Sequence, residues 1–208
     1  MDIAKFRKKP LLGIMRGVKP DDIDPLAEAA ISAGLETIEI TMNTDNAPTL
    51  IRSMVRAAKG RLAIGAGTVL TMEDLKTALD AGATFIVMPV LIRDVAETCA
   101  KNRIPVFPGA LSPQEIYDAW QAGATMVKVF PAKLFGPEYF REIKGPFEKI
   151  ELLACAGVTP ENMKDYFACG ASAVSFGASV FKREWLDKKD FKSITNRIKD
   201  YIREMPPC

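Results

Sequence analysis

Residues 62–82 read LAIGAGTVLTMEDLKTALDAG and contain the pattern that decides the fold. Leu62–Val69 is a short apolar run that predicts a buried strand, and Met72–Ala81 has the apolar spacing of an amphipathic helix. Gly82 suits the left-handed position that ends such a helix. The same order recurs along the chain. It predicts eight strands, at Leu11–Arg16, Glu36–Met42, Leu62–Val69, Thr84–Pro89, Ile104–Ala110, Thr125–Pro131, Ile150–Val158 and Ser172–Val180.

Helical patterns lie between these strands and after the last one. They predict helices at Asp22–Ala33, Pro48–Ala58, Met72–Ala81, Arg93–Lys101, Pro113–Gln121, Pro160–Ala168 and Phe191–Arg203, and the pattern is weakest around Pro137–Ile143. Strands alternating with helices predict an α/β protein with a parallel sheet. Eight units without a long linker predict one domain over residues 1–208, a (β/α)8 TIM barrel of short form with an N-terminal helix. An open doubly wound sheet is the alternative.

Histidine is absent, which excludes imidazole bases, the usual serine and cysteine triads, and His-ligated zinc. No D-x-D or D-D-x-x-D cluster lies at a predicted strand end, so we expect no metal. A net charge of +2 is too small to indicate a nucleic-acid partner. Without a membrane-length apolar run or a secretory signal, we expect a cytoplasmic protein with no membrane partner. We expect reduced thiols at Cys99, Cys155, Cys169 and Cys208.

Lys128 lies between Val127 and Val129 in a predicted strand that otherwise has a fully buried pattern. Alternation along the strand puts Lys128 on the face opposite the valines, and the valines suit the side that meets the helices. Lys128 therefore points into the predicted barrel. Burial favours the neutral amine of a lysine, and a neutral amine is a nucleophile. Such a lysine forms Schiff bases with carbonyl substrates.

Glu39 has a similar position in the second predicted strand, between Ile38 and Ile40. An inward carboxylate beside an inward amine offers a general acid and base next to a nucleophile. Active sites of barrels gather at the C-terminal ends of the strands, which favours catalysis. From charge placement alone, a buried structural ion pair between Glu39 and Lys128 is the alternative.

Two glycine-bearing stretches belong to the last two βα units. Loops at these places in barrels commonly bind phosphate through backbone N–H groups. They supply five candidate phosphate ligands, Gly157, Val158, Gly177, Ala178 and Ser179. A capped turn with Thr159 as the N-cap is the alternative for the first stretch.

Five short motifs are specific as a set: Glu39-Ile-Thr, Gly65-Ala-Gly-Thr-Val-Leu70, Lys128-Val-Phe-Pro-Ala132, Gly157-Val-Thr-Pro-Glu-Asn162 and Gly177-Ala-Ser179. Together they resemble the 2-keto-3-deoxy-6-phosphogluconate / 4-hydroxy-2-oxoglutarate aldolase family, a group of class I aldolases. The resemblance covers about Leu12 to Arg183. It implies a barrel, commonly a homotrimer without a cofactor, that cleaves a small-molecule 2-keto acid to pyruvate and an aldehyde. The aldehyde is glyceraldehyde 3-phosphate for the phosphorylated sugar acids and glyoxylate for 4-hydroxy-2-oxoglutarate.

The resemblance also implies roles for single residues. Lys128 matches the Schiff-base lysine, Glu39 the general acid and base, and Thr68 a threonine that contacts pyruvate. Pro89 and Phe130 are expected to line the same pocket.

Two departures concern the substrate. Asn43 stands where many members have an arginine that holds the substrate carboxylate, and the branch acting on the galactonate epimer is similar to this chain there. Arg16 ends the first predicted strand at the same mouth and is a candidate for the missing cation, with an ordinary surface arginine as the alternative. Ala156 replaces the first glycine of a frequent pair, and Cys155 stands where threonine is often found. The preferred sugar therefore stays open.

Two other functions fit the same residues. One is a metal-free sugar-phosphate isomerase or epimerase in which Lys128 and Glu39 act as acid and base. The other is a barrel that binds sugar phosphates without catalysis.

Overall fold

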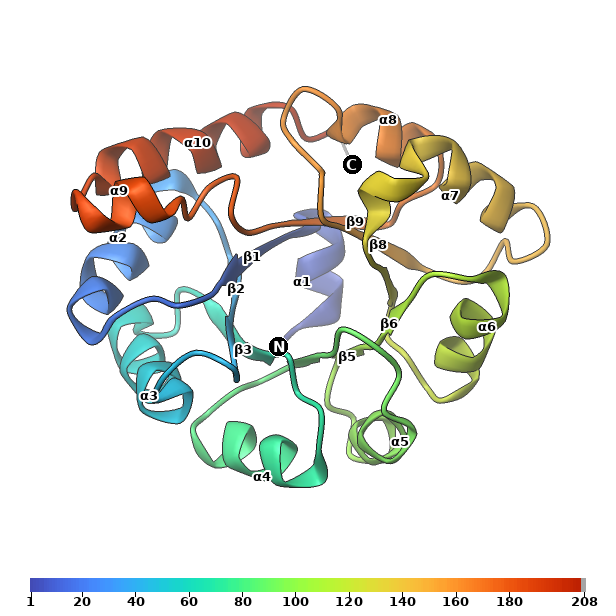
Figure 1. The fold of residues 1–208 in the computed structure, drawn as a ribbon, viewed down its shortest axis with the longest axis horizontal. Coiled ribbons are helices and arrows are strands. Elements are labelled where there is room, and N and C mark those ends of the chain that lie inside the picture. The colour runs from blue at the N-terminus through green and yellow to red at the C-terminus, as the bar shows by residue number, and fades with distance from the viewer. Residues whose placement is uncertain (207–208) are drawn as a thin grey trace.

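The computed structural model describes residues 1–206, so Cys208, expected to be a reduced thiol, lies outside the described residues. The strands of residues 1–206 are β1 Leu11–Met15, β2 Thr37–Thr41, β3 Ala63–Gly67, β4 Ile86–Val87, β5 Val106–Phe107, β6 Gly109–Ala110, β7 Val127–Val129, β8 Leu152–Cys155 and β9 Ala173–Phe176. They pair in parallel in the order β5-β4-β3-β2-β1-β9-β8-β7-β6 and form the wall of a barrel (Figure 1).

The two ends of this order, β5 and β6, are halves of one predicted strand. Pro108, which has no N–H to donate, separates them. On one side the segment pairs with β4, because the Met88 N–H donates to the Phe107 oxygen at 3.1 Å. On the other side the Lys128 N–H donates to the Pro108 oxygen at 2.9 Å. The ring therefore closes as eight βα units, which confirms the TIM barrel and excludes the open sheet.

Helices surround the ring on the outside, except for α1, which lies over one of its openings (Figure 1). Within residues 1–206 they are α1 Ile3–Lys8, α2 Ile23–Ala33, α3 Ala47–Ala58, α4 Met72–Asp80, α5 Arg93–Lys101, α6 Pro113–Gln121, α7 Gly136–Lys144, α8 Met163–Ala168, α9 Arg183–Asp187 and α10 Phe191–Arg203, with the 3-10 turns η1 Pro20–Asp22 and η2 Ala132–Leu134. The bounds of α5, α6 and α10 agree with the prediction. None of the helices in the described part is long and apolar enough to cross a membrane.

Some predicted bounds are wrong at the C-terminal ends of the strands. The seventh predicted strand ends at Cys155 instead of Val158, because Ala156 and Gly157 have positive φ angles of 73° and 89° and turn the chain. The last strand ends at Phe176, where a turn begins. The helix predicted from Pro160 begins at Met163, and α9 was not predicted. The residues taken as strand ends are thus loops at the mouth of the barrel.

The strands alternate between two apolar cores. Outward side chains such as Ile38, Val127 and Val129 pack against the helices in one cluster. Inward side chains such as Leu12 and Met126 form a second cluster inside the barrel. This is the alternation expected for strands covered by helices on one face.

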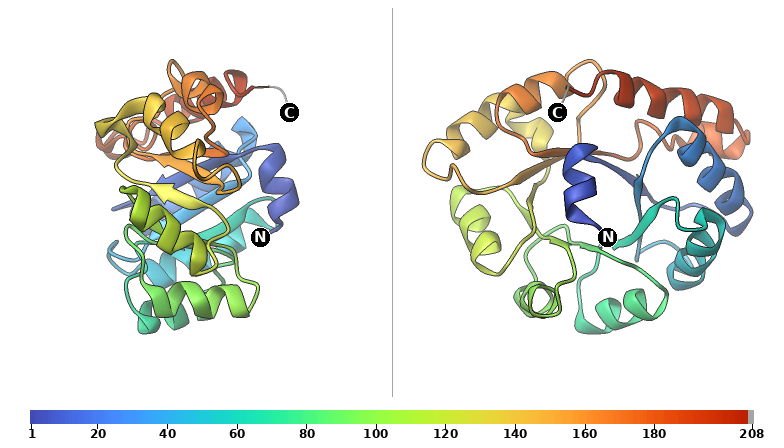
Figure 2. Two further views of the ribbon diagram at one scale, coloured as in Figure 1. Left: turned by 90° about the vertical axis from the view of Figure 1, so that its right-hand side faces the viewer. Right: turned by 180° about the vertical axis from the view of Figure 1, so that it is seen from behind.

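The N-terminal helix closes the bottom of the barrel. Helix α1 lies across the opening at the N-terminal ends of the strands (Figure 2, right). Its Phe6 is 3% exposed and meets the Phe107 ring edge-on, with the centroids 5.9 Å apart. Phe85 also meets Phe107 edge-on, with the centroids 5.9 Å apart. Because this end is filled with aromatic rings, a substrate can enter the barrel interior only from the opposite end.

Candidate active site

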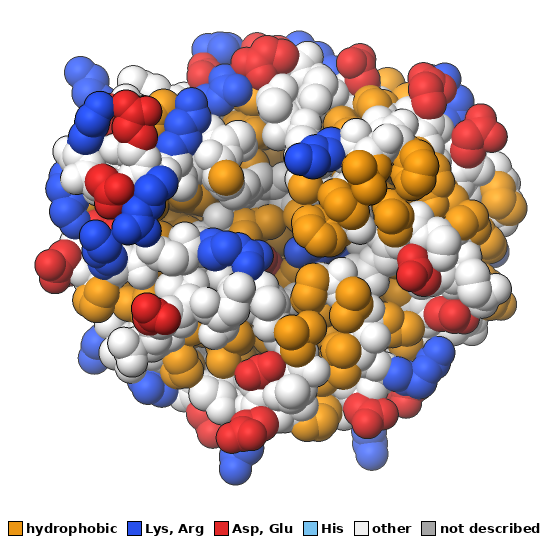
Figure 3. All heavy atoms as spheres, in the orientation of Figure 1, with side chains coloured by type: hydrophobic (Ala, Val, Ile, Leu, Met, Phe, Trp, Pro, Cys, Tyr) orange, Lys and Arg blue, Asp and Glu red, His pale blue; other side chains and the backbone are white. Residues whose placement is uncertain are grey.

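A cavity of about 350 Å³ opens at the C-terminal ends of the strands. Figure 3 shows the hollow in the middle of this face. Ten of the twelve residues predicted as ligands or catalysts line it: Arg16, Thr68, Pro89, Lys128, Phe130, Gly157, Val158, Gly177, Ala178 and Ser179. The other two, Glu39 and Asn43, adjoin it without lining it. The tertiary fold therefore gathers predicted residues from the ends of six of the eight strands, or the loops that follow them, around one cavity.

Lys128 belongs to the cavity wall, as alternation along β7 predicts. Its side chain points inward while Val127 and Val129 are fully buried against the helices. Lys128 is 7% exposed, and its Nζ lies 5.4 Å from the centroid of the Phe130 ring. The amine is thus largely shielded from water but open to the cavity.

Glu39 is 1% exposed, and its Oε2 has no hydrogen-bond partner within the described residues. Burial raises the pKa of Glu39 to about 7, although the charges of Lys128 and Arg16 act in the opposite direction. Glu39 and Lys128, both in the described part, make no direct ion pair. The structural ion pair that charge placement left open is therefore wrong. A carboxylate of this kind can exchange a proton near neutral pH.

Arg16 and Asn43 meet at the rim. The guanidinium of Arg16 donates to the Asn43 Oδ1 at 3.2 Å. The loop that follows Arg16 is tied down as well, because the Gly17 N–H donates to the Thr44 hydroxyl at 3.1 Å and Thr44 bonds to Thr41. Arg16 is therefore a positioned cation of the cavity.

Thr68 lines the cavity in a strained conformation. Its φ is 57°, which is uncommon for a β-branched residue. Such strain is held in place by the surrounding structure and clusters at functional sites. Thr68 directly follows β3, so this strained residue stands where the strand ends at the cavity.

The two glycine loops present backbone donors to the same space. The N–H groups of Gly157, Val158, Gly177, Ala178 and Ser179 donate no hydrogen bond to any other group of residues 1–206. The first loop is shaped by Asn162, whose amide donates to the Gly157 oxygen at 3.0 Å and accepts from the Thr159 N–H at 2.8 Å. The N-cap of α8 is Asn162 and not Thr159, and a turn held by the Asn162 side chain leads from Thr159 into the helix.

Tyr201 of α10 joins the two loops from behind. Its hydroxyl donates to the Val158 oxygen at 2.8 Å, so the Ser179 hydroxyl at 2.9 Å must donate to Tyr201. Tyr201 is fully buried and stacks on Phe176 with the centroids 4.3 Å apart. The sequence did not predict this residue, because it lies in the last helix, 43 residues from Val158 and 22 from Ser179, and no local pattern links it to the loops.

The cavity also contains side chains that the sequence did not predict, among them Lys133 and Ser175. Ser175 follows the inward alternation of β9 and could have been found from it. Lys133 lies in the η2 turn after β7, where a lysine alone is usually a solvated surface residue. Only the packing of this turn against the loop after β8 reveals it.

A protein-family model described as KDPG and KHG aldolase matches residues 3–197. The chain belongs to this family. It is a class I aldolase, a carbon–carbon lyase, and the family favours this function over the isomerase and the binding barrel. The aldolase is 32% identical over 176 residues to the 2-dehydro-3-deoxy-6-phosphogalactonate aldolase of Escherichia coli. The matched residues cover 84% of this chain and 86% of that protein.

Two solved structures are similar to the aldolase over most of their length. One, described as a native KDPGal structure, has a TM-score of 0.87 at 28% identity and covers 94% of this chain and 93% of that one. The other is the KDPG aldolase of Legionella pneumophila with pyruvate captured as a covalent carbinolamine. It has a TM-score of 0.86 at 26% identity and covers 94% of this chain and 95% of that one.

Proposed function

We propose that the aldolase cleaves 2-keto-3-deoxy-6-phosphogalactonate to pyruvate and glyceraldehyde 3-phosphate through a Schiff base on Lys128. The observation that supports the reaction is the buried amine of Lys128, which has no carboxylate partner and faces a cavity of substrate size. The galactonate epimer is supported by the residue at position 43. Many family members have an arginine there, whereas Asn43 of this chain accepts a hydrogen bond from Arg16. The similarity to a phosphogalactonate aldolase points the same way.

The proposed substrate lies with its carboxylate toward Arg16 and its phosphate toward the two glycine loops. Arg16 is fixed by Asn43, and a guanidinium binds carboxylates through charge-assisted hydrogen bonds. Thr68, Pro89 and Phe130 line the space between these ends and contact the pyruvate half. The free N–H groups of the loops from Gly157 and from Gly177 bind the phosphate oxygens.

In the proposed reaction the Lys128 Nζ attacks the C2 ketone, and the carbinolamine loses water to form an iminium ion. Glu39 supplies and accepts the protons of this step. The ionised Glu39 then takes the proton of the C4 hydroxyl, and the C3–C4 bonding electrons move into the iminium. The aldehyde leaves, and an enamine remains on Lys128. Glu39 returns its proton to C3, and water hydrolyses the resulting iminium to pyruvate and the free amine.

Borohydride reduction in the presence of pyruvate tests the Schiff base. We expect inactivation, with one reduced pyruvate unit on the peptide that contains Lys128. Lys128→Met should abolish both the adduct and turnover. A label on another lysine, or none, contradicts the mechanism.

The substrate is tested by comparing kcat/KM for three compounds, the phosphogalactonate and phosphogluconate epimers and unphosphorylated 4-hydroxy-2-oxoglutarate. We expect the galactonate epimer to be the best of the three. Asn43→Arg should reduce this preference, because a second cation beside Arg16 changes how the carboxylate end is held. A clear preference of the wild-type protein for the gluconate epimer contradicts the proposal.

We also propose that the aldolase works as a homotrimer in the cytoplasm, as the family resemblance implies. Large apolar side chains exposed near the cavity support an interface: Val90 is 52% exposed, Leu134 60% and Phe135 58%. Figure 3 shows apolar side chains gathered beside the hollow. Sedimentation velocity should give a trimer, and Phe135→Glu combined with Leu134→Glu should give monomers that remain folded by circular dichroism. A wild-type monomer contradicts this proposal, and cell fractionation checks the location.

A further inference from the structure

The charges that line the cavity are all of one sign. Its lining within the described residues contains three basic side chains, Arg16, Lys128 and Lys133, and no carboxylate. The proposed reaction uses Arg16 at the substrate carboxylate and Lys128 at the ketone. It leaves Lys133 without a role.

Lys133 lies directly against the first glycine loop. Its backbone N–H donates to the Ala156 oxygen at 3.0 Å. A Cβ placed on Gly157 would lie 2.3 Å from the Cβ of Lys133, so the stem of the lysine occupies the space beside the glycine. The Lys133 side chain therefore begins next to the first glycine loop. In this loop the N–H groups of Gly157 and Val158 have no hydrogen-bond partner within residues 1–206.

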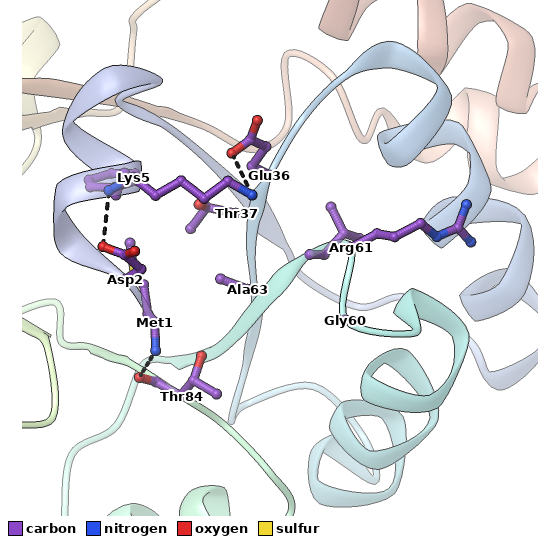
Figure 4. Close-up of a pocket in the computed structure, with 11 residues that line it drawn as sticks. Met1, Asp2, Lys5, Glu36, Thr37, Gly60, Arg61, Ala63 and Thr84 are labelled. Carbon is purple, nitrogen blue, oxygen red and sulfur yellow. Dashed lines mark hydrogen bonds and ion pairs between the residues drawn. The ribbon is translucent and has the colours of Figure 1, made fainter.

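The Lys133 ammonium makes no ion pair with any carboxylate of residues 1–206. The cavity at the other end of the barrel shows the opposite arrangement (Figure 4). There Lys5 pairs with Glu36 at 3.2 Å, and Arg61 extends away toward Glu28, 3.7 Å from its guanidinium. Both basic side chains of that cavity are therefore paired with carboxylates. The cavity of Lys128, in contrast, has several basic side chains and no carboxylate in its described lining.

We propose that Lys133 is a specificity-determining residue that binds the substrate phosphate and makes the aldolase prefer phosphorylated substrates. This inference rests on the proposed function, because it assumes that the two glycine loops receive the phosphate. The three basic side chains then match three parts of the substrate: Arg16 binds the carboxylate, Lys133 binds the phosphate, and the amine of Lys128 attacks the ketone. A flexible ammonium at the rim adds charge to the neutral N–H donors of the loops and attracts a dianion from solution.

The test compares Lys133→Met with Lys133→Arg and with the control Lys76→Met, which removes an exposed lysine of α4 far from the cavity. We expect Lys133→Met to raise KM for the phosphorylated substrate about tenfold, the size of one exposed charge-assisted contact, with kcat little changed. KM for 4-hydroxy-2-oxoglutarate should stay unchanged. Lys133→Arg should keep most of the phosphate preference, and Lys76→Met should alter neither substrate. Equal losses on both substrates, or no loss, overturn the proposal.

A binding measurement separates this inference from the proposed function. Glycerol 3-phosphate carries the phosphate but no ketone, and its calorimetric Kd depends on neither turnover nor the choice of sugar epimer. We expect Lys133→Met to weaken its binding about tenfold, with a smaller dependence on salt concentration than in the wild-type protein. Equal binding by the two proteins, or no binding by the wild type, overturns the role of Lys133 even if the cleavage reaction is as proposed. A wild-type protein that binds glycerol 3-phosphate through Lys133 but prefers another sugar acid overturns only the proposed substrate.

Discussion

Gly67 of β3 and Glu39 of β2 lie so close inside the barrel that a Cβ on Gly67 would be 2.3 Å from the Glu39 Oε1. The glycine therefore makes the space that the buried carboxylate occupies. Gly67→Ala should displace the carboxylate and lower kcat/KM about a hundredfold, the usual effect of misplacing a catalytic group by about 1 Å.

Gly13→Ala is the matched control for this change. Gly13 lies in β1, and a Cβ there would meet the Leu35 side chain at 3.2 Å, on the helix-facing side of the barrel. It should change stability slightly and leave kcat/KM near the wild-type value. Wild-type activity in Gly67→Ala would show that the position of Glu39 does not limit catalysis.

The raised pKa of Glu39 predicts the pH dependence of activity. As a base, Glu39 must be ionised, and burial raises its pKa to about 7. The profile of kcat/KM against pH should therefore have a rising limb with its midpoint near pH 7. This parameter reports the pKa values of groups in the free enzyme. Glu39→Gln should lower kcat/KM strongly and remove the limb. A limb that persists in Glu39→Gln assigns it to another group.

The same carboxyl affects stability with a definite sign. Its pKa is higher in the folded protein than its usual value of 4.5, so the folded state holds the proton to higher pH than the unfolded state. Stability should therefore fall as pH rises from about 4.5 to about 7. Over this range the free energy of unfolding of the wild type should fall by about 3 kcal/mol more than that of Glu39→Gln. Urea denaturation at both ends of the range checks it, and parallel pH profiles of the two proteins contradict it.

Tyr201→Phe should loosen both glycine loops. The substitution removes the hydroxyl that bonds to the Val158 oxygen and to Ser179, and it should cost about 1–2 kcal/mol of stability. We expect KM for phosphorylated substrates to rise severalfold and KM for 4-hydroxy-2-oxoglutarate to stay the same. Tyr166→Phe is the control, since the Tyr166 hydroxyl has no hydrogen bond within residues 1–206. A uniform loss on all substrates would mean that Tyr201 acts only through general stability.

Ala156→Gly should stabilise the protein. Ala156 has a φ of 73°, a left-handed conformation that costs an alanine about 1–2 kcal/mol. Part of this gain is offset by the greater freedom of glycine in the unfolded chain, so the net gain should be about 0.5–1 kcal/mol. Ala154→Gly, in the preceding strand β8, should instead destabilise. Thermal unfolding distinguishes the two, and a loss of stability in Ala156→Gly contradicts the expectation.

Helix α6 shows how a cap in the local sequence fixes the start of a helix. Ser112 and Glu115 form reciprocal hydrogen bonds between side chain and backbone, and the bounds of α6 agree with the prediction. Strand ends near the mouth were predicted too long, because apolar residues such as Val158 continue the strand pattern into a loop. Their burial comes from the loop packing against Tyr201, which local sequence does not contain.

Local pattern alone determined which faces of β2 and β7 point inward, because alternation along a strand is a property of the backbone. It therefore determined that Glu39 and Lys128 enter one barrel, and the motifs around them determined the family. That residues 1–208 form one domain stays a prediction. The tertiary structure decided that Glu39 and Lys128 do not pair, that Asn43 holds Arg16, and that Lys133 and Tyr201 belong to the site. These relations join residues far apart in the chain, and ring closure and side-chain packing set their distances.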